Sequence, residues 1–480
     1  MRMAAVRAGL WAMAMGAGAA VALGQGLPPA PPVETPLVRI PLPTPSGADL
    51  AGGVPQGAAT AGTLGLSLGE AIERGLRFNL GPLLAQSGTE AARAQRLAAI
   101  AALLPHVNAS AGQLRQKINL AAFGFSLPGF PPIVGPFDVF QASAAANIPV
   151  LNLSAIQNAR AANGLQAAAR DDYQSVRNMV VLAVANQYLL SVADESRVRA
   201  AQAELATAQS QLQQARDMLR AGTVNALAPV RAQVQRDRQR QLLTAAQDAL
   251  AKQRLQLQRA IGMPLNQSFR LTSRGPFQPL PPPTLAAAEA EALAQRPDYR
   301  AARVTVRAAE LALAAARDQR LPTLSLNGNY GTIGHELSSN HPIFEVGATV
   351  EMPMFEGGAI RAQQLAAEAQ LHAAENRAAD LRAGIGVEVR TALLDLADNR
   401  SQVSVTLDAR NLAQQELTLA TDRFRAGVAD NLEVVEAQQS VADASENYIA
   451  SLYGYNLAKA ALAEALGVAA REYARYLPNR

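Results

Sequence analysis

The sequence of this chain repeats one plan twice. Residues 68–76 (LGEAIERGL) correspond to residues 285–293 (LAAAEAEAL), and the tripeptide RAG at residues 220–222 returns at residues 425–427. An internal repeat limits the possible folds more than any single motif, because each copy must bury the same face in an equivalent place. We therefore predict two structurally equivalent halves.

The boundaries of the halves follow from this correspondence. We predict a first repeat over residues 65–270, a proline-rich linker at residues 271–284, a second repeat over residues 285–468 and a tail at residues 469–480. The first repeat carries an insertion at residues 120–137 that the second lacks. This insertion is expected to be an external loop between two strands.

The N-terminus has the pattern of a secretory signal peptide, which we place at residues 1–24. A basic start precedes a short apolar run, and small residues follow it. Residues 25–64 are rich in Pro, Gly and Ala, and are expected to be an extended or disordered lead-in. The N-terminal apolar run is short for a membrane span, and no apolar run beyond it is long enough to predict a transmembrane helix. The sequence has no cysteine, which excludes disulfides, thiolate metal sites and a lipid anchor on cysteine.

Long helices are predicted in both halves. Residues 151–220 and 355–425 contain no proline, and seventy helical residues make a rod on the order of 100 Å long. Each rod ends at an RAG tripeptide, where glycine suits a helix C-terminus. A second long helix then returns, at residues 225–261 and 431–466. In the last of these, apolar residues recur at the spacing of a coiled-coil seam: Val441, Tyr448, Leu452, Tyr455, Leu462 and Leu466.

Three segments instead alternate apolar and polar residues, which indicates strands, and the repeat implies a fourth, less regular strand near residues 106–118. They lie at about residues 106–118, 138–149, 323–332 and 343–353, and their length suits tilted transmembrane strands. A soluble half-buried hairpin is the alternative interpretation. Four strands cannot close a barrel, and open sheet edges are not tolerated in lipid. We therefore expect an oligomer, in which three copies would supply twelve strands.

This plan resembles the TolC-like outer-membrane efflux protein family over roughly residues 66–468. The duplication and the hairpin motifs RAGTVN at 220–225 and RAGVAD at 425–430 carry the resemblance. It implies an α+β membrane protein: a homotrimer with a twelve-stranded β-barrel in the outer membrane and an α-helical barrel across the periplasm. It also implies contact with a periplasmic adaptor protein and an inner-membrane pump.

The resemblance further implies a periplasmic constriction formed by acidic residues after the second RAG. Glu433 and Glu436 occupy the matching positions, and Asp430 precedes them. Ordinary preference of carboxylates for a helix N-terminus is the alternative interpretation. The first repeat has Ala228 and Arg231 at the matching positions, and Arg231 is a candidate partner for either glutamate.

The same hairpin tips are the expected contact with the adaptor. Glycine keeps such a turn tight, and an exposed apolar residue offers a partner helix something to bury, although simple helix capping would explain the glycines equally well. The candidate contact residues are Arg220, Gly222, Val224, Arg425, Gly427 and Val428.

No catalytic set, cofactor motif or nucleic-acid-binding patch is assembled in the sequence, and we predict no enzyme and no cofactor. His335, Glu336 and His341 could bind a metal, but a surface loop at residues 331–342 is the preferred interpretation, and we predict no metal site. We expect an outer-membrane channel that exports small molecules. A conduit for type I protein secretion is the alternative within this class, and a periplasmic coiled-coil scaffold without a pore is the alternative outside it.

Overall fold

The computed structural model describes residues 47–119, 122, 131–426, 428–429 and 431–477 of the 480-residue chain. The signal peptide, much of the 25–64 segment and most of the 120–137 loop lie outside these residues, as do Gly427 and Asp430. The chain divides into two compact units. The strand unit includes Ala101–Leu153 and Arg320–Met354, and the helical unit includes Leu42–Ile100, Ser154–Gln319 and Phe355–Arg480.

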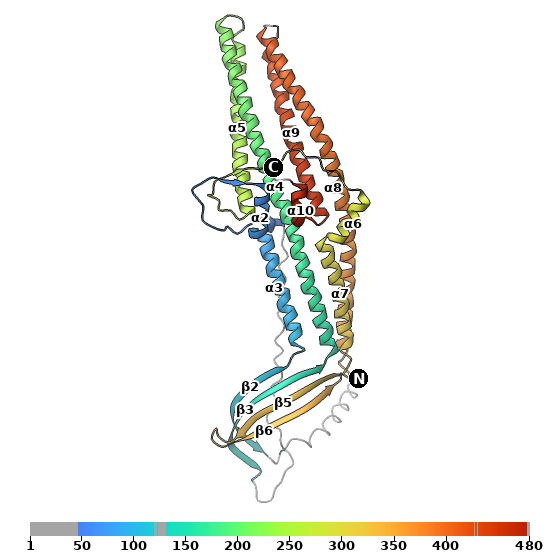
Figure 1. The fold of residues 1–480 in the computed structure, drawn as a ribbon. Helices are drawn as coiled ribbons and strands as arrows, with labels where there is room; N and C mark the ends of the chain where they lie inside the picture. The colour runs from blue at the N-terminus through green and yellow to red at the C-terminus, as the bar shows by residue number, and fades with distance from the viewer. Residues whose placement is uncertain (1–46, 120–121, 123–130, 427, 430, 478–480) are drawn as a thin grey trace, which may run out of the picture. The chain divides into compact units, whose positions relative to one another are not determined.

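The strand unit is a four-stranded antiparallel sheet in the order β2-β3-β5-β6 (Figure 1). Its strands overlap the three segments in which alternation predicted a strand and the fourth segment, which the repeat implied. The pairing of β3 with β5 joins the first copy to the second, while β2 and β6 lie at the edges. The strand bounds are β2 His106–Asn119, β3 Ile133–Leu151, β5 Thr323–Gly334 and β6 Asn340–Glu351.

The loops predicted between the strands are shorter than expected. Strand β3 begins at Ile133, so residues 133–137 of the predicted insertion are strand. In the second copy the predicted loop bounds, residues 331 and 342, are both wrong, because cross-strand pairing continues to Gly334 opposite Asn340. His341 therefore lies within β6, opposite Ile333.

The helical unit shows the same order of helices in each copy. A short pair of helices precedes a very long helix, and a second long helix returns antiparallel to it (Figure 1). The first copy has α2 (Leu68–Phe78), α3 (Leu80–Ala101), α4 (Leu153–Arg220) and α5 (Leu227–Ala260). The second has α6 (Leu285–Gln295), α7 (Pro297–Asp318), α8 (Ala359–Arg425) and α9 (Asn431–Ala465). In chain order, α1 (Gly47–Leu50) precedes the first copy and α10 (Ala469–Tyr476) follows the second.

A capping box begins α2. The Ser67 hydroxyl accepts a hydrogen bond from the Glu70 backbone N–H at 3.2 Å, and the Glu70 carboxylate accepts one from the Ser67 N–H at 2.7 Å. The surrounding pentapeptide GLSLG at 65–69 has the spacing of a hydrolase nucleophile motif. Here the serine hydroxyl is occupied by the helix cap, so the motif reflects local helix chemistry.

A two-stranded parallel sheet holds the predicted linker against the first copy. It pairs β1 (Leu64–Leu66) with β4 (Phe269–Leu271). The buried Tyr188 hydroxyl of α4 donates to the Leu66 carbonyl at 2.9 Å and accepts from the Ser273 N–H at 3.0 Å. The sequence did not predict these strands, because three residues are too few to show a period of two.

Two flanking segments form hydrogen bonds with the rest of the helical unit: residues 47–64, the described part of the predicted 25–64 lead-in, and the predicted tail. In the lead-in, the Thr60 N–H donates to the Gln267 side chain at 2.7 Å, and the Val54 N–H donates to the Phe78 carbonyl at 2.8 Å. The tail contains α10, whose Ala470 N–H donates to the buried Asn178 side chain of α4 at 2.8 Å. Both segments are therefore anchored to the helical unit through hydrogen bonds that sequence composition does not reveal.

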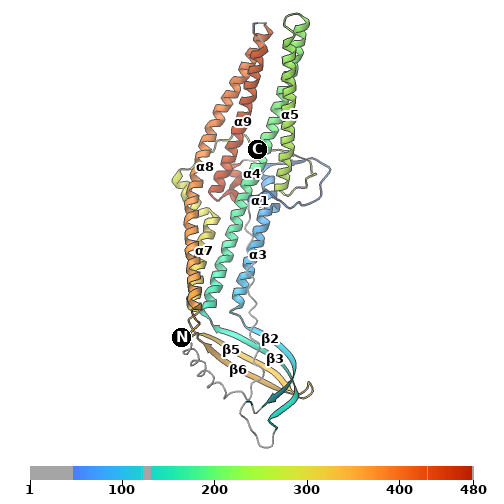
Figure 2. The ribbon, with the colours of Figure 1, turned by 180° about the vertical axis from the view of Figure 1, so that it is seen from behind.

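The four long helices lie in the order α5-α4-α9-α8 (Figures 1 and 2). The Arg254 guanidinium of α5 lies 2.7 Å from the Glu195 carboxylate of α4, and Tyr453 of α9 donates to Asn186 of α4 at 2.5 Å. Helices α8 and α9 pack along each other as a hairpin. Within one chain, α5 and α8 are therefore the outermost long helices.

The main core of the helical unit lies where these helices meet the short ones. Tyr455, Leu462 and Leu466 of the predicted coiled-coil seam are fully buried in it. In the described part of the chain, one helix, α4, contains a stretch with a mean hydropathy of 1.3 that meets the length and composition criteria for a membrane span. More than half of that stretch (56%) is buried within the chain, and α4 contributes Val180, Val184 and Tyr188 to the core.

Candidate functional site

The first hairpin tip is closed by a helix-ending motif centred on Gly222. The Thr223 N–H donates to the Met218 carbonyl at 3.0 Å, and the Gly222 N–H donates to the Leu219 carbonyl at 3.0 Å. Gly222 has φ = +73°, a left-handed conformation that glycine adopts without a steric penalty. This pair of bonds is the Schellman arrangement, so Gly222 ends α4.

The second tip repeats part of this motif. The Val428 N–H donates to the Arg423 carbonyl at 3.1 Å, the counterpart of the bond from Thr223. Val428 is 68% exposed, and Val224 at the first tip is half-buried. Arg220 and Arg425 are exposed, and each forms an ion pair with an aspartate three residues earlier on its own helix. The arginines thus lie at the helix ends, where they also complement the helix dipole.

Apolar contacts beneath the tips hold them in place. Phe424 of α8 packs with the buried Val434 and Ala437 of α9, and Met218 of α4 packs against the same cluster. The first hairpin is closed by a smaller cluster that contains Leu212 of α4 and Ala232 of α5. Because Met218 reaches the second hairpin, the two tips are tied together through side-chain packing.

Glu433 and Glu436 lie on the first turns of α9, and both are exposed. They line a shallow groove of about 440 Å³ between α8 and α9, together with Leu412, Leu419 and Arg423. Arg423 Nε lies 3.2 Å from Glu433 Oε2, so one of the two carboxylates has a cationic partner on α8. The groove therefore combines three carboxylates, of Glu416, Glu433 and Glu436, with one guanidinium and a few aliphatic side chains.

The pairing expected for Arg231 is not found within one chain. The ion pairs of the described residues join Glu433 to Arg423, and none of them includes Arg231. Arg231 lies near the start of α5, and α4 separates α5 from α9 in the helix order. Arg423 was not among the predicted site residues, although it lies only two residues before the RAG tripeptide and across the hairpin from Glu433.

The histidines considered as metal ligands lie on different elements. His335 follows β5, and its Nδ1 lies 2.9 Å from the Asp138 carbonyl oxygen, whereas His341 pairs within the sheet. Among the residues with described positions, no group of three or more His, Asp or Glu side chains is arranged to hold a metal ion. The candidate functional site therefore consists of charged and apolar side chains at the hairpin tips.

The model of the family described as outer membrane efflux protein matches residues 84–263 and 290–468 of this chain. The chain belongs to the outer membrane efflux protein family. The two matched ranges correspond to the two copies, and the resemblance seen in the sequence is confirmed. This is a family of transport channels rather than of enzymes, and it places the chain among outer-membrane efflux components.

Individual relatives agree with this family assignment. The pyoverdine export outer membrane protein of Pseudomonas aeruginosa is 28% identical over 78% of this chain and 80% of its own length. The toluene efflux pump outer membrane protein of Pseudomonas putida is 26% identical over 79% of this chain and 78% of its own length. The CmeC outer membrane channel of Campylobacter jejuni superposes with a TM-score of 0.75 at 18% identity, over 88% of this chain and 92% of that structure. The α+β fold of this efflux family member is thus that of a known outer-membrane channel.

Proposed function

We propose that three copies of this chain form an outer-membrane channel with a periplasmic helical tunnel, through which a tripartite pump exports small molecules. The observation that carries the proposal is that the outermost elements of both units expose apolar side chains. Isolated chains of this kind would leave sheet edges and helix faces unpaired, which a closed ring of copies would cover.

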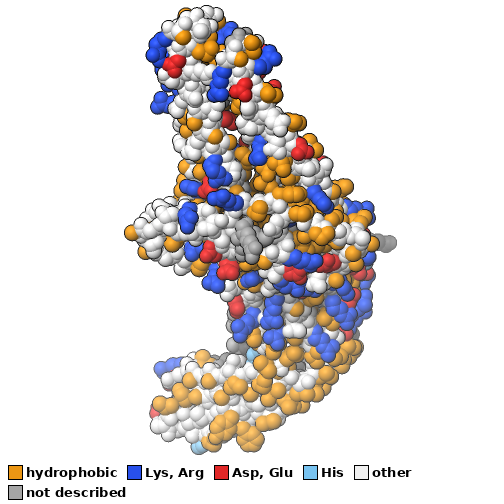
Figure 3. Space-filling model, turned by 45° about the horizontal axis from the view of Figure 1, so that its top comes forward, with side chains coloured by type: hydrophobic (Ala, Val, Ile, Leu, Met, Phe, Trp, Pro, Cys, Tyr) orange, Lys and Arg blue, Asp and Glu red, His pale blue; other side chains and the backbone are white. Residues whose placement is uncertain are grey.

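The sheet supports ring closure through its edge strands. Phe344 and Val346 of β6 are each 80% exposed, and Val350 is 68% exposed, all on one side of the strand. Figure 3 shows hydrophobic side chains gathered over the sheet. Because the four strands alternate in direction, β6 of one copy beside β2 of the next would continue the antiparallel pattern. A twelve-stranded barrel from three copies would then have no free edge.

The outermost helices support the same arrangement. On α8, Leu394, Leu412 and Leu419 are each more than 60% exposed, and on α5 Val230 and Val234 are 57% and 65% exposed. Such solitary aliphatic side chains along a helix are well suited to pack against a neighbouring helix. The two helices also carry opposite charges that have no partner among the described ion pairs: Arg231 and Arg238 on α5, and Asp408 and Glu416 on α8.

Three copies would bring the tips of the second hairpins together around one axis. Glu433 and Glu436 of each copy, with Asp430, would then form an acidic constriction that favours cations. Arg231 of a neighbouring copy remains a candidate partner for these carboxylates. The tip residues, including the exposed Gly222 and Val428 and the half-buried Val224, would meet the periplasmic adaptor, which in turn connects the channel to an inner-membrane pump.

The cargo proposed is a small molecule rather than a protein. The relatives named for pyoverdine export and toluene efflux support this choice, since both names refer to small-molecule cargo. The absence of cysteine agrees with assembly through the barrel, without a lipid anchor on cysteine. A signal peptide at residues 1–24 would deliver the chain to the periplasm.

Single-channel recording in planar bilayers tests the proposal. The purified protein should insert as a trimer and conduct cations in preference to anions. The double variant Glu433→Gln with Glu436→Gln should lower this preference, because it removes the charge and keeps the shape. A matched control, Glu310→Gln on α7, should leave selectivity unchanged. Absence of conductance from a well-folded trimer would refute the channel, and unchanged selectivity in the double variant would refute the acidic constriction.

A further inference from the structure

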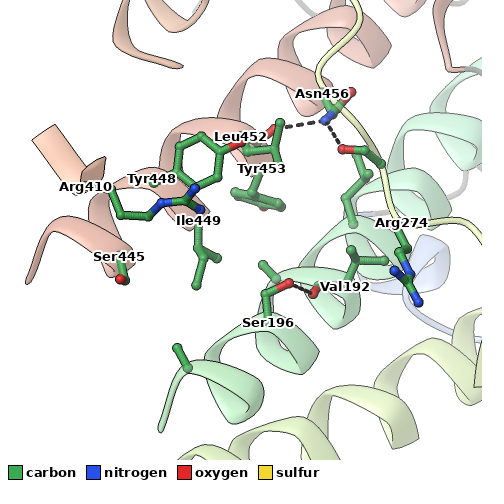
Figure 4. A pocket seen from close by; sticks show the side chains of 14 residues that line it. Val192, Ser196, Arg274, Arg410, Ser445, Tyr448, Ile449, Leu452, Tyr453 and Asn456 are labelled. Carbon is green, nitrogen blue, oxygen red and sulfur yellow. Dashed lines mark hydrogen bonds between the residues drawn. The ribbon is translucent and has the colours of Figure 1, made fainter. Parts of the chain in front are cut away.

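A second cavity lies far along the long helices from the hairpin tips. It occupies about 240 Å³ between α4 and α9, and we call it the α4–α9 groove (Figure 4). Its walls are mainly apolar, and two arginines reach it from outside these helices, Arg410 from α8 and Arg274 from the segment after β4. The principal apolar lining residues are Leu189, Val192, Ile449 and Leu452.

The groove is elongated along the helix axes. Its lining runs from Leu189 to Ala200 on α4 and from Ser445 to Asn456 on α9. At ~1.5 Å of rise per residue, each wall is on the order of 16 Å long. Ala193 and Ala200 are small, which leaves space between the helices along this length. The shape therefore suits one extended chain better than a compact ring system.

The charges around the groove are unequally satisfied. Arg197, which is adjacent, has two carboxylate partners: its Nη1 lies 2.8 Å from Asp194 and its Nη2 lies 2.7 Å from Glu446. Arg410 and Arg274 take part in none of the ion pairs found among the described residues. The groove thus combines mainly apolar walls with two guanidinium groups that form none of the ion pairs found among the described residues.

Arg410 is the better placed of the two to hold a ligand. Its guanidinium carbon lies 4.5 Å from the centroid of the Tyr448 ring, which itself lines the groove, and the side chain is half-buried. This stacking orients the guanidinium plane and leaves its edge free for hydrogen bonds. Arg274 is exposed, whereas the Asn456 amide beside it already donates to the Gly275 and Leu452 carbonyls.

We propose that the α4–α9 groove binds a single-chain amphiphilic carboxylate, with the alkyl chain between α4 and α9 and the carboxylate on Arg410. A guanidinium prefers a planar carboxylate, to which it donates two parallel hydrogen bonds. The narrow apolar groove favours one alkyl chain, since the cavity volume is below the range typical of sites for larger ligands. The proposal concerns a binding site on the wall of the helical unit, and it is independent of whether the channel conducts.

Binding of sodium decanoate tests the proposal directly. The full protein is placed in phosphatidylcholine nanodiscs and titrated calorimetrically, and the signal from empty nanodiscs is subtracted. We expect one decanoate per chain and a Kd at least about tenfold weaker in Arg410→Gln, since charge-assisted hydrogen bonds are lost. Ala200→Leu, which fills the groove, should weaken binding as well. Arg400→Gln, an exposed arginine of the same helix, should bind as the unaltered protein does.

Neutral decanol shows how much of the affinity comes from the alkyl chain alone. It should bind to the unaltered protein more weakly than decanoate does. Decanol and decanoate should bind to Arg410→Gln with equal affinity. Thermal unfolding of each variant checks that the helices remain folded. Binding that is insensitive to both Arg410→Gln and Ala200→Leu would overturn the proposal. A second result would also overturn it: no binding of decanoate, together with weaker binding of a purified adaptor protein to Ala200→Leu. The occupant of the groove would then be a protein segment.

Discussion

Arg197 of α4 holds Glu446 of α9 in a two-pronged ion pair, with Nε 3.0 Å from both carboxylate oxygens and Nη2 2.7 Å from Oε1. The two residues belong to different copies of the repeat and are separated by 249 positions in the sequence. Asp194 contacts the same guanidinium, and these carboxylates keep the pKa of Arg197 above its usual value. The pair therefore joins the first hairpin to the second.

Charge reversal at Arg197 alone should destabilise the protein, and simultaneous reversal at Arg197 and Glu446 should destabilise it less. Arg197→Glu places three carboxylates together, and we expect it to lower the free energy of unfolding by about 1–3 kcal/mol. Adding Glu446→Arg should recover part of the loss. Thermal unfolding followed by helical circular dichroism measures this, with Arg93→Glu on α3 as a control, since its Glu90 partner is exposed. Additive losses in the double variant would show that the pair contributes no coupling.

Replacement of Lys459 by methionine should stabilise the protein. Lys459 is 1% exposed, lies over the Tyr455 ring and has no ion-pair partner among the described residues. Burial lowers the pKa of Lys459 to about 8. The charged form is thus disfavoured on folding, at a cost on the order of 3 kcal/mol below that pKa. Stability of the unaltered protein should rise between about pH 8 and pH 10.5, and Lys459→Met should remove this rise; an unchanged pH profile would contradict it.

Glu464 should make the helical unit more stable as the pH falls. Burial raises the pKa of Glu464, the charges of Glu388 and Asp298 raise it further, and Arg296 opposes them. The folded state therefore holds a proton more readily than the unfolded state, so stability is greatest below the ordinary pKa of glutamate and declines as pH rises through the raised value. Glu464→Gln should be more stable than the unaltered protein at pH 7.5 and less pH-dependent, as measured by chemical unfolding. A variant that loses stability at pH 7.5 would contradict this account.

Removal of Arg423 should change selectivity in the direction opposite to removal of the glutamates. Arg423→Gln leaves Glu433 without its cation, so the proposed constriction becomes more negative. The reversal potential under a salt gradient should shift toward the cation limit. Arg307→Gln on α7 is a matched control, because Arg307 also pairs with an exposed glutamate. An unchanged reversal potential would show that the groove at the tip does not line the pore.

Alanine should have opposite effects at two glycines of the long helices. Gly222→Ala should destabilise by about 1 kcal/mol, because its φ of +73° is strained for any other residue although its surroundings are open. Gly384→Ala, in the middle of α8 and also in open space, should stabilise by up to about 1 kcal/mol because alanine favours the helix. Chemical unfolding of both variants tests this, and a neutral Gly222→Ala would contradict the capping role.

Local patterns in the sequence were enough to predict the principal elements. A period of two predicted strands at the places where β3, β5 and β6 lie, and the repeat predicted the strand at β2. Proline-free runs ending in RAG predicted the long helices. These signals are local, because side-chain direction within a strand or helix depends on neighbouring residues. The pattern also contained Lys459, which fills the gap in the coiled-coil seam between Tyr455 and Leu462. A charged residue there was not counted as part of a buried seam.

The tertiary structure alone decided how the two copies face each other. The order α5-α4-α9-α8, the Arg197–Glu446 pair, the Arg423–Glu433 pair and the α4–α9 groove all depend on which helix faces adjoin. No period within one helix specifies its neighbour, since an apolar stripe can be covered by several partners at similar cost in free energy. The sequence by itself determined two copies of a strand-and-helix plan; the packing of distant side chains determined which surfaces remain free for a second copy, a partner or a ligand.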